Sequence, residues 1–543
     1  MIKNIKEENK VRSNITKYIF ILIVIILLIT AAFLIYGNRP KENVGFIQKE
    51  EEQIEMITNL RIPIVEFDTI NPIISKNQNI QDISRLIYEP LLNITPDGKI
   101  NLCLAKEWTK QNGTSYVIKL KDNIKWQDGK LLTSKDVQFT MDRIKDANTN
   151  SIYAYQVQEV IGIEIIDDTT IKINLANEVP FFEYNLTFPI MPYHYFENKD
   201  FLENAKDEYP IGIGRFEIIK EGEKVFLKQN KNWWNIENDP TKLTEIEIIK
   251  FANMGEVYNA FKIGNIDLLT TRTLNVEDYI GTIGYQKKEY SGGEIDYIAF
   301  NCENKVLANI EVRKAIMHLI DKNNIVSGIY KEKYQTINFP VIGNNTSYLY
   351  EKDRIKYEYN QEQARQILES AEWNLQKKTW QKIKDYRTQR LRFDMIVNIE
   401  NEKRVQVAEN IKNTLEDFGI NINLRKVNNN QYLNYLKNKN YDIIITGVYS
   451  GFSPDISYYF GENNIANFYN EEINQIIDEV KNIQEERVLK EKYERIIQIY
   501  EENIPYVFLY QNKNTLIYRP NLVGDINPNR YNVYEGIGSW YRQ

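Results

Sequence analysis

The chain has 543 residues, of which 43% are hydrophobic and 26% are charged, and its net charge is −7. That length exceeds what one hydrophobic core can organise, so we expect two or three domains of ordinary globular composition. Lysines and acids are mixed along the whole chain without a basic patch, which argues against a nucleic-acid partner.

An apolar stretch lies near the N-terminus, at residues 18–36, where 19 residues carry no charge. As a helix it would be about 28 Å long, enough to span the hydrocarbon core of a bilayer. The basic residues before it are Lys3, Lys6, Lys10, Arg12 and Lys17. Only Arg39 and Lys41 follow closely. The positive-inside rule therefore predicts that residues 1–17 are cytoplasmic and that the bulk of the chain is extracellular.

Two other interpretations of this stretch are a cleaved signal peptide and a lipoprotein signal. The apolar run is longer than a usual signal core, no clear A-x-A site follows it, and no cysteine stands just after it. We therefore expect an uncleaved signal-anchor that crosses the cell membrane once. Residues 37–54 are charged and lack periodicity, as expected of a linker.

The first half of the folded part mixes strand and helix patterns. Strands are expected at residues 115–120, 160–166 and 170–175. Residues 133–144 begin with capping residues and continue with helical apolar spacing. These elements indicate an α+β subdomain. The G-x-G within residues 211–219 lacks the third glycine of a nucleotide-binding loop.

The second half alternates strand and helix patterns. The expected strands span residues 391–397, 420–427 and 441–446, and the expected helices between them span 403–418 and 431–437. This βαβ order predicts a mostly parallel sheet. A long charged helix is expected at residues 472–502, followed by a late strand at 504–510.

The sequence gives little indication of a catalytic site or a metal site. His194, His318, Cys103 and Cys302 lack metal-ligand spacing, so we expect structural roles for them and no metal or other cofactor. No nucleophile motif or distinctive carboxylate pair is present, so nothing in the residues supports an enzyme, although they do not exclude one. The 37 tyrosines either line a cleft for peptides or sugars or simply fill cores and surfaces.

Residues 441–460 combine a short apolar run with an aromatic loop. Ile443, Ile444 and Ile445 precede Gly447, and the loop after it contains Tyr, Ser, Gly, Phe and Pro residues. The run is typical of a buried strand, and α/β folds bind ligands beyond the C-terminal ends of such strands. An ordinary turn after a buried strand is the alternative.

Six segments resemble, in the same order, the extracytoplasmic solute-binding proteins of peptide-type ABC importers, the oligopeptide- and dipeptide-binding family 5. They are IYEPLLNITPDGKINLCLAKEW (87–108), SYVIKLKDNIKWQDGKLLTSKDVQFTMDRI (115–144), IGIGRFEII (211–219), NKNWW (230–234), VRKAIMHLIDKNNIV (312–326) and YDIIITGVYSGFSPDISYYF (441–460). The resemblance extends from about residue 55 to the C-terminus.

This resemblance implies an α/β fold of the periplasmic-binding-protein-like type II, in which two lobes close on a ligand. The first lobe would comprise residues 55–295 with a subdomain inserted at about 90–205, the second lobe 296–508, and residues 509–543 would return to the first lobe. The two strands of the hinge would cross near residues 295–301 and 507–511.

In relatives that bind peptides, the ligand pairs with the backbone of the segment that matches Gly447–Gly451. The resemblance therefore implies ligand-binding roles for Gly447, Val448, Tyr449, Ser450, Gly451 and Phe452. A carboxylate usually holds the peptide ammonium there, but the matching position is Gly451, or Ser450 if the alignment slips by one. Burying an unpaired ammonium costs several kcal/mol. We therefore expect Asp455 or, from the first lobe, Glu66 beside Phe67 to contribute.

Three functions stay open. The first is a monomeric, membrane-anchored solute-binding protein that delivers a peptide or peptide-like solute to the permease subunits of an ABC importer. The second has the same fold but binds another solute, such as an oligosaccharide or a metal chelate, because the usual acid is missing. The third is a membrane-anchored sensor without transport, since relatives in Gram-positive cells usually carry a lipid anchor instead of a helix.

Overall fold

The computed structural model describes residues 22–27, 30, 56–203, 205–273, 275–281, 284–340, 358–483 and 485–543. The chain divides into two compact units, Met1–Glu55 and Met56–Gln543. In the first unit, residues 22–27 are helical. Among the described residues no helix is long and apolar enough to cross a membrane. The predicted cytoplasmic segment, the predicted linker and most of the predicted membrane span 18–36 lie outside the described residues.

The first lobe is built on a sheet with the strand order β1-β10-β9-β8. Its strands are β1 (Asn59–Val65), β8 (Phe216–Glu221), β9 (Lys224–Gln229) and β10 (Glu245–Phe251). Helix α2 (Gln78–Ile87) begins at Asn77, whose side chain accepts a hydrogen bond from the backbone of the first turn. Ile80, Ile83 and Ile87 on this helix are buried in the same core as Ile62 of β1.

A separate sheet, in the order β4-β5-β7-β6, forms the expected α+β part of this lobe. Its elements are β4 (Ala105–Asn112), β5 (Ser115–Leu120), β6 (Val160–Asp167), β7 (Thr170–Leu175) and α3 (Ser134–Lys145). Val137, Met141 and Ile144 of α3 are buried, as their helical spacing predicts. The shorter elements are β2 (Leu92–Ile94), β3 (Ile100–Leu102), η1 (Ala154–Val157), η2 (Phe182–Leu186) and α4 (Tyr193–Phe196).

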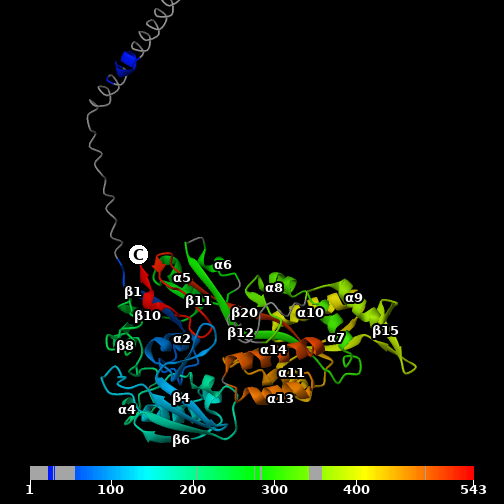
Figure 1. Cartoon of the computed structure of the whole chain (residues 1–543), viewed down its shortest axis with the longest axis horizontal. Coiled ribbons are helices and arrows are strands. Elements are labelled where there is room, and N and C mark those ends of the chain that lie inside the picture. Colours follow the sequence, from blue (N-terminus) through cyan, green and yellow to red (C-terminus); the bar gives the residue numbers. More distant parts are fainter. Residues whose placement is uncertain are drawn as a thin grey trace, which may run out of the picture. The chain divides into compact units, whose positions relative to one another are not determined.

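The largest sheet has the order β11-β20-β12-β19-β17-β18, and β13 also pairs with β20. Its strands are β11 (Leu268–Thr271), β12 (Gln286–Phe300), β13 (Tyr334–Thr336), β17 (Arg392–Asn398), β18 (Asn421–Val427), β19 (Ile443–Tyr449) and β20 (Tyr506–Tyr518). Figure 1 shows the long strands β12 and β20 side by side between α2 of the first lobe and α10 (Glu402–Phe418).

The prediction of a mostly parallel sheet is wrong. β17 runs parallel to β18 and β19, as the βαβ pattern predicts, but β11, β12, β13 and β20 pair antiparallel. The physical reason is that β12 and β20 come from outside the βαβ units. They pair with each other, and β12 also pairs antiparallel with β19, so the sheet is mixed.

The apolar run of β19 is buried on both faces of this sheet. Ile443 and Ile445 belong to one hydrophobic core and Ile444 to the other, because successive strand residues point to opposite faces. The first core also contains residues of α7 (Ile310–His318), α8 (Lys322–Tyr330), α9 (Gln361–Ser370) and α10. The second contains residues of α11 (Asn429–Asn438), α12 (Ser457–Phe460), α13 (Glu471–Val480) and α14 (Glu486–Asn503). The prediction of a buried strand is confirmed.

Two local features differ from the sequence-based expectation. The single helix expected at residues 472–502 is divided into α13 and α14, and the carbonyl of Lys481 at the break accepts a hydrogen bond from Lys110 Nζ at 2.9 Å. A small sheet of β14 (Asn374–Gln376), β15 (Thr379–Lys384) and β16 (Arg387–Arg390) also follows α9. Its strands are short and polar, so their pattern carries no strong strand signal.

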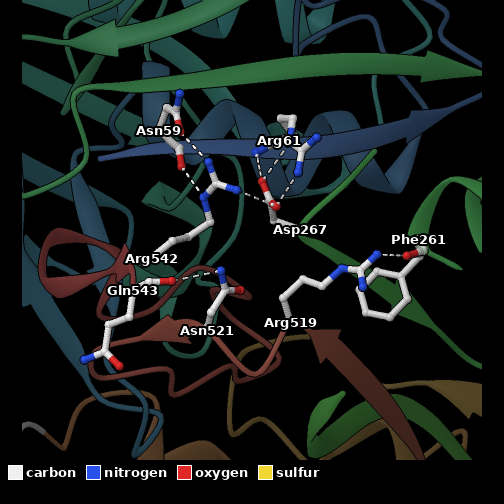
Figure 2. A network of polar contacts seen from close by, with 8 residues as sticks. All are labelled: Asn59, Arg61, Phe261, Asp267, Arg519, Asn521, Arg542 and Gln543. Carbon is white, nitrogen blue, oxygen red and sulfur yellow. Dashed lines mark hydrogen bonds and ion pairs between the residues drawn. The ribbon is translucent and has the colours of Figure 1, made fainter. Parts of the chain in front are cut away.

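The C-terminal residues are held against the first lobe by a polar network (Figure 2). They include β21 (Leu522–Val523), η4 (Ile537–Ser539) and β22 (Tyr541–Arg542). The Asp267 carboxylate, just before β11, is 2% exposed and accepts hydrogen bonds from Arg61 of β1 at 2.8 Å and from Arg542 at 3.2 Å. Arg542 also donates to Asn59 O, and Arg519 donates to Phe261 O of α5 (Met254–Ile263). Helix α6 (Glu277–Ile280) packs on α5 in a small separate core.

Replacing Asp267 by Asn is expected to lower the free energy of unfolding by about 3 kcal/mol, because it leaves two arginines without their shared buried counter-charge. Chemical unfolding followed by tryptophan fluorescence measures this change. The matched control is Asp417→Asn, since Asp417 is exposed and no described residue forms a hydrogen bond or an ion pair with its side chain, and its effect should stay within about 0.5 kcal/mol. Equal loss in both variants would contradict the role assigned to Asp267.

Candidate functional site

The candidate site begins where β19 passes a buried ion pair. Asp296 of β12 and Arg404 of α10 approach to 2.7 Å (Oδ1 to Nη2), and Tyr510 of β20 donates to the same carboxylate at 3.2 Å. Burial by itself lowers the pKa of Arg404, but the adjacent Asp296 raises it above its ordinary value. Arg404 therefore stays charged, and its contact with Asp296 joins α10 to the sheet at the level of Gly447, which lies opposite Asp296.

Gly447 is required by this ion pair. A Cβ at this position would lie 2.1 Å from Asp296 Oδ1 and 2.3 Å from Arg404 Nη2. Gly293 of β12 is similarly restricted, because its Cβ would lie 2.5 Å from the Tyr449 ring. Both glycines thus allow a close approach of side chains to the backbone.

Among the described residues, one edge of β19 has no neighbouring strand after Ile444. Ser450 N donates to Gly293 O at 2.8 Å, so the alternate residues Gly447 and Tyr449 direct their backbone groups to the opposite edge. β17 pairs with that edge only as far as Ile444. Within the part of the chain that the structure describes, no backbone or side-chain group bonds to the N–H or C=O of Gly447 or Tyr449.

Two cavities of about 640 and 520 Å³ adjoin this open edge. Both are lined by Gln78 and Asp82 of α2, by Tyr449, and by Arg530 of the C-terminal segment. Each volume is in the usual range for a small-molecule site. The two cavities therefore form one cleft between α2 and the end of β19, with contributions from both lobes.

The structure places the predicted site residues in different positions. Tyr449, Ser450, Gly451 and Phe452 line the 520 Å³ cavity. Gly447 and Val448 precede them in β19, where they pair with Asp296 and Ile295 of β12.

The other three predicted residues do not line either cavity. Glu66 is exposed, and Phe67 lies under the Lys250 ammonium, which is 3.8 Å from the ring centroid. Asp455 accepts hydrogen bonds from Ser457 N and Oγ, both at 2.9 Å, at the start of α12. Asp455 is thus engaged in local capping.

Several cleft residues were not predicted. They are Gln78, Asp82, Arg85, Tyr153, Tyr155 and Gln156 from the first lobe, Arg272 directly after β11, and Arg530 and Tyr531 near the C-terminus. The spacing of Gln78, Asp82 and Arg85 puts three polar side chains on one face of α2, a signal that the sequence does contain. Arg530 carries no comparable local signal, because it reaches the cleft only through the fold.

The histidines and cysteines lie away from this cleft. His194 contacts Asp128 at 3.0 Å, and His318 Nδ1 lies 2.9 Å from Glu358 O. Cys103 and Cys302 form no disulfide. Among the described residues no group of three or more His, Cys, Asp or Glu side chains is arranged to hold a metal ion.

The model of the bacterial extracellular solute-binding proteins, family 5, matches residues 99–467. The chain belongs to this family. It is 22% identical to the oligopeptide-binding protein OppA of Bacillus subtilis, over 90% of this chain and 93% of OppA. It is 24% identical to the oligopeptide-binding protein AppA of the same organism, over 94% of this chain and 96% of AppA.

A solved structure has the same fold. The structure of Bacillus subtilis AppA in complex with a nonapeptide aligns with a TM-score of 0.56 and 22% identity, over 89% of this chain and 99% of that one. The chain is therefore a two-lobed α/β solute-binding protein of family 5, which is a family of binding proteins and not of enzymes. The cleft between its lobes is the candidate solute site.

Replacing Gly447 by Ala is expected to destabilise the protein by about 1–3 kcal/mol, because the new methyl group overlaps the Asp296–Arg404 pair. Gly451→Ala is the matched control in the same segment, since a Cβ there meets no atom within 4 Å. Thermal unfolding of both variants measures the difference. A Gly447→Ala protein as stable as the Gly451→Ala protein would show that the strand has room to move.

Proposed function

We propose that this protein captures a peptide between its two lobes and delivers it to the permease subunits of an ABC importer. The open edge of β19 is the observation that carries the proposal. Its unpaired backbone groups at Gly447 and Tyr449 match the hydrogen-bonding groups of an extended peptide, which would add to the sheet as a strand. The peptide-binding names of the relatives OppA and AppA support this choice of solute.

Closure of the lobes would involve the long paired strands β12 and β20, which contribute Tyr290 and Leu516 to the core of the first lobe and Ile298 and Val507 to a core of the second. We propose lobe 1 at residues 55–295, with the subdomain at 90–205, lobe 2 at 296–508, and the return to lobe 1 at 509–543. Contacts away from the hinge support a closing motion: Lys110 donates to Asn482 Oδ1 at 2.8 Å, and Lys99 pairs with Glu486 at 2.9 Å. Such contacts can form only when the lobes approach.

Anchoring by the N-terminal segment is part of the proposal. The described residues 22–27 are helical and apolar, with side chains from Val24, 39% exposed, to Leu27, 61% exposed. Thr30 Oγ1 donates to the carbonyls of Ile26 and Leu27 at 2.9 and 3.0 Å, so its hydroxyl is satisfied within the helix, as a lipid environment requires. The folded unit would then stand on the extracellular side.

Peptide binding is tested with a library of tri- to pentapeptides, by native mass spectrometry and calorimetry of the full chain. For the best binder, methylating one backbone nitrogen at a time is expected to weaken binding about tenfold at alternate positions, because one net hydrogen bond is lost at each. The intervening positions are the internal control, since strand pairing has a period of two. Absence of any binding peptide would refute the proposed solute.

Anchoring is tested in cells that express the full chain. The protein is expected to stay in the membrane fraction after an alkaline wash, with residues 18–36 present in the mature protein and the folded unit open to added protease. Val24→Glu combined with Leu27→Glu should release it, because each acid costs about 2.5–3.5 kcal/mol in a membrane helix. Lys41→Glu is the control. A mature chain that begins after residue 36 would exclude the anchor.

A further inference from the structure

Arg530 lies beside Ser450, the residue that follows β19. Its Nη2 donates to Ser450 O at 2.8 Å and its Nη1 to Ser450 Oγ at 3.2 Å. The guanidinium carbon is 5.2 Å from the Phe452 ring centroid and 5.6 Å from that of Tyr531. The loop after β19 therefore packs around a cation, directly after Tyr449, the last residue of the strand.

Arg530 has no counter-charge. Among the residues that the structure describes, no carboxylate forms an ion pair with it, and its buried Nε has no acceptor. Burial lowers the pKa of Arg530, and only the tyrosines Tyr531, Tyr449 and Tyr155 oppose this effect. A buried guanidinium with two of its five N–H groups bonded can still take up an anion.

Arg85 is a second cation on the same cavity. It lines the 520 Å³ cavity together with Arg530, and no described residue forms a hydrogen bond or an ion pair with its side chain. Asp82 is the one acid that lines this cavity within the described part of the chain. Burial raises the pKa of Asp82 to about 6, and the hydrogen bond from Gln78 and the charge of Arg85 reduce this rise only in part. The cavity therefore carries more positive than negative charge.

A peptide ammonium is the wrong group for this position. Gly451 supplies no acid, and a Cβ there would meet no atom within 4 Å, so no neighbouring carboxylate fills the space beside it. An ammonium placed beside Ser450 would instead face the Arg530 guanidinium, and Asp82, the one described acid on this cavity, already has a hydrogen bond from Gln78 and the charge of Arg85 beside it. A carboxylate at the same place would gain two cations.

We propose that the end of the solute beside Ser450 carries a carboxylate, which Arg530 and Arg85 bind. This inference rests on the proposed function, because the solute is placed along the open edge of β19. The carboxylate has two sources, the C-terminus of a peptide or an acidic group at its amino end. The aromatic rings of Phe452 and Tyr531 keep the Arg530 guanidinium in place for this contact.

The test compares three forms of the same tri- to pentapeptide library: free peptides, C-terminal amides, and C-terminal amides with an N-succinyl group. We expect one carboxylate-bearing form to bind the wild-type full chain at least about tenfold more tightly than the form without that carboxylate. Loss on amidation identifies the C-terminal carboxylate, and gain on succinylation identifies an acidic amino end.

Arg85→Gln should reduce this preference to about threefold or less, because it removes a cation that holds no other described group in place. Arg390→Gln is the matched control, since Arg390 is exposed on β16 and no described residue forms a hydrogen bond or an ion pair with its side chain, and it should keep the full preference. Equal binding of all three forms by the wild type, or an unchanged preference in Arg85→Gln, would overturn the inference and leave peptide capture intact. If no form binds, peptide capture fails as well.

Discussion

The buried ion pair between Asp296 and Arg404 is the interaction on which the candidate site depends. It lies where α10 meets β12, β19 and β20, and Tyr510 completes the hydrogen bonding of the carboxylate. A buried pair of this kind costs much desolvation, and it persists only when its partners are fixed. Here it leaves no room for a side chain at position 447. The same contact therefore keeps position 447 a glycine, in the part of β19 whose outer edge β17 does not reach.

Many residues in the segments that identify the family stabilise the fold and do not line the cleft. Glu89 accepts hydrogen bonds from the indole nitrogens of Trp233 and Trp234, which joins the first of the six segments to the NKNWW segment. Arg313, in the VRKA segment, donates to the carbonyls of Asn503 and Ile504 at the end of α14. Ile504 has a φ of 45°, unusual for a β-branched residue. Arg313 and Pro505, the residue after Ile504, thus define where α14 ends.

The sequence predicts much of the fold but, of the candidate site, only the residues at the end of β19. The β17-α10-β18-α11-β19 alternation is predictable because its periodicity is local. The antiparallel pairing of β12 with β20 joins residues more than 200 positions apart, and no local pattern encodes it. Tyr449 to Phe452 follow a recognisable strand, whereas Arg530 reaches the cleft only because Asp267 and its partners hold the C-terminal segment on the first lobe. Glu66 and Asp455 are the acids expected from the sequence to lie near the solute, but neither lines the cleft. Among the described residues, the acid that does line it is Asp82.

The buried charges of this protein fall into two groups that differ in how completely they are paired. Glu89 and Arg313 are surrounded by matched donors or acceptors, so their charges stabilise one arrangement of the scaffold. Asp82 has one hydrogen bond from Gln78, and Arg530 keeps donors without acceptors. Incomplete pairing of these two groups raises the free energy of the protein when the cleft holds no solute. A solute with complementary groups lowers this free energy again. Asp82 and Arg530 line the same 520 Å³ cavity, so a solute bound there can supply the partners that the chain does not.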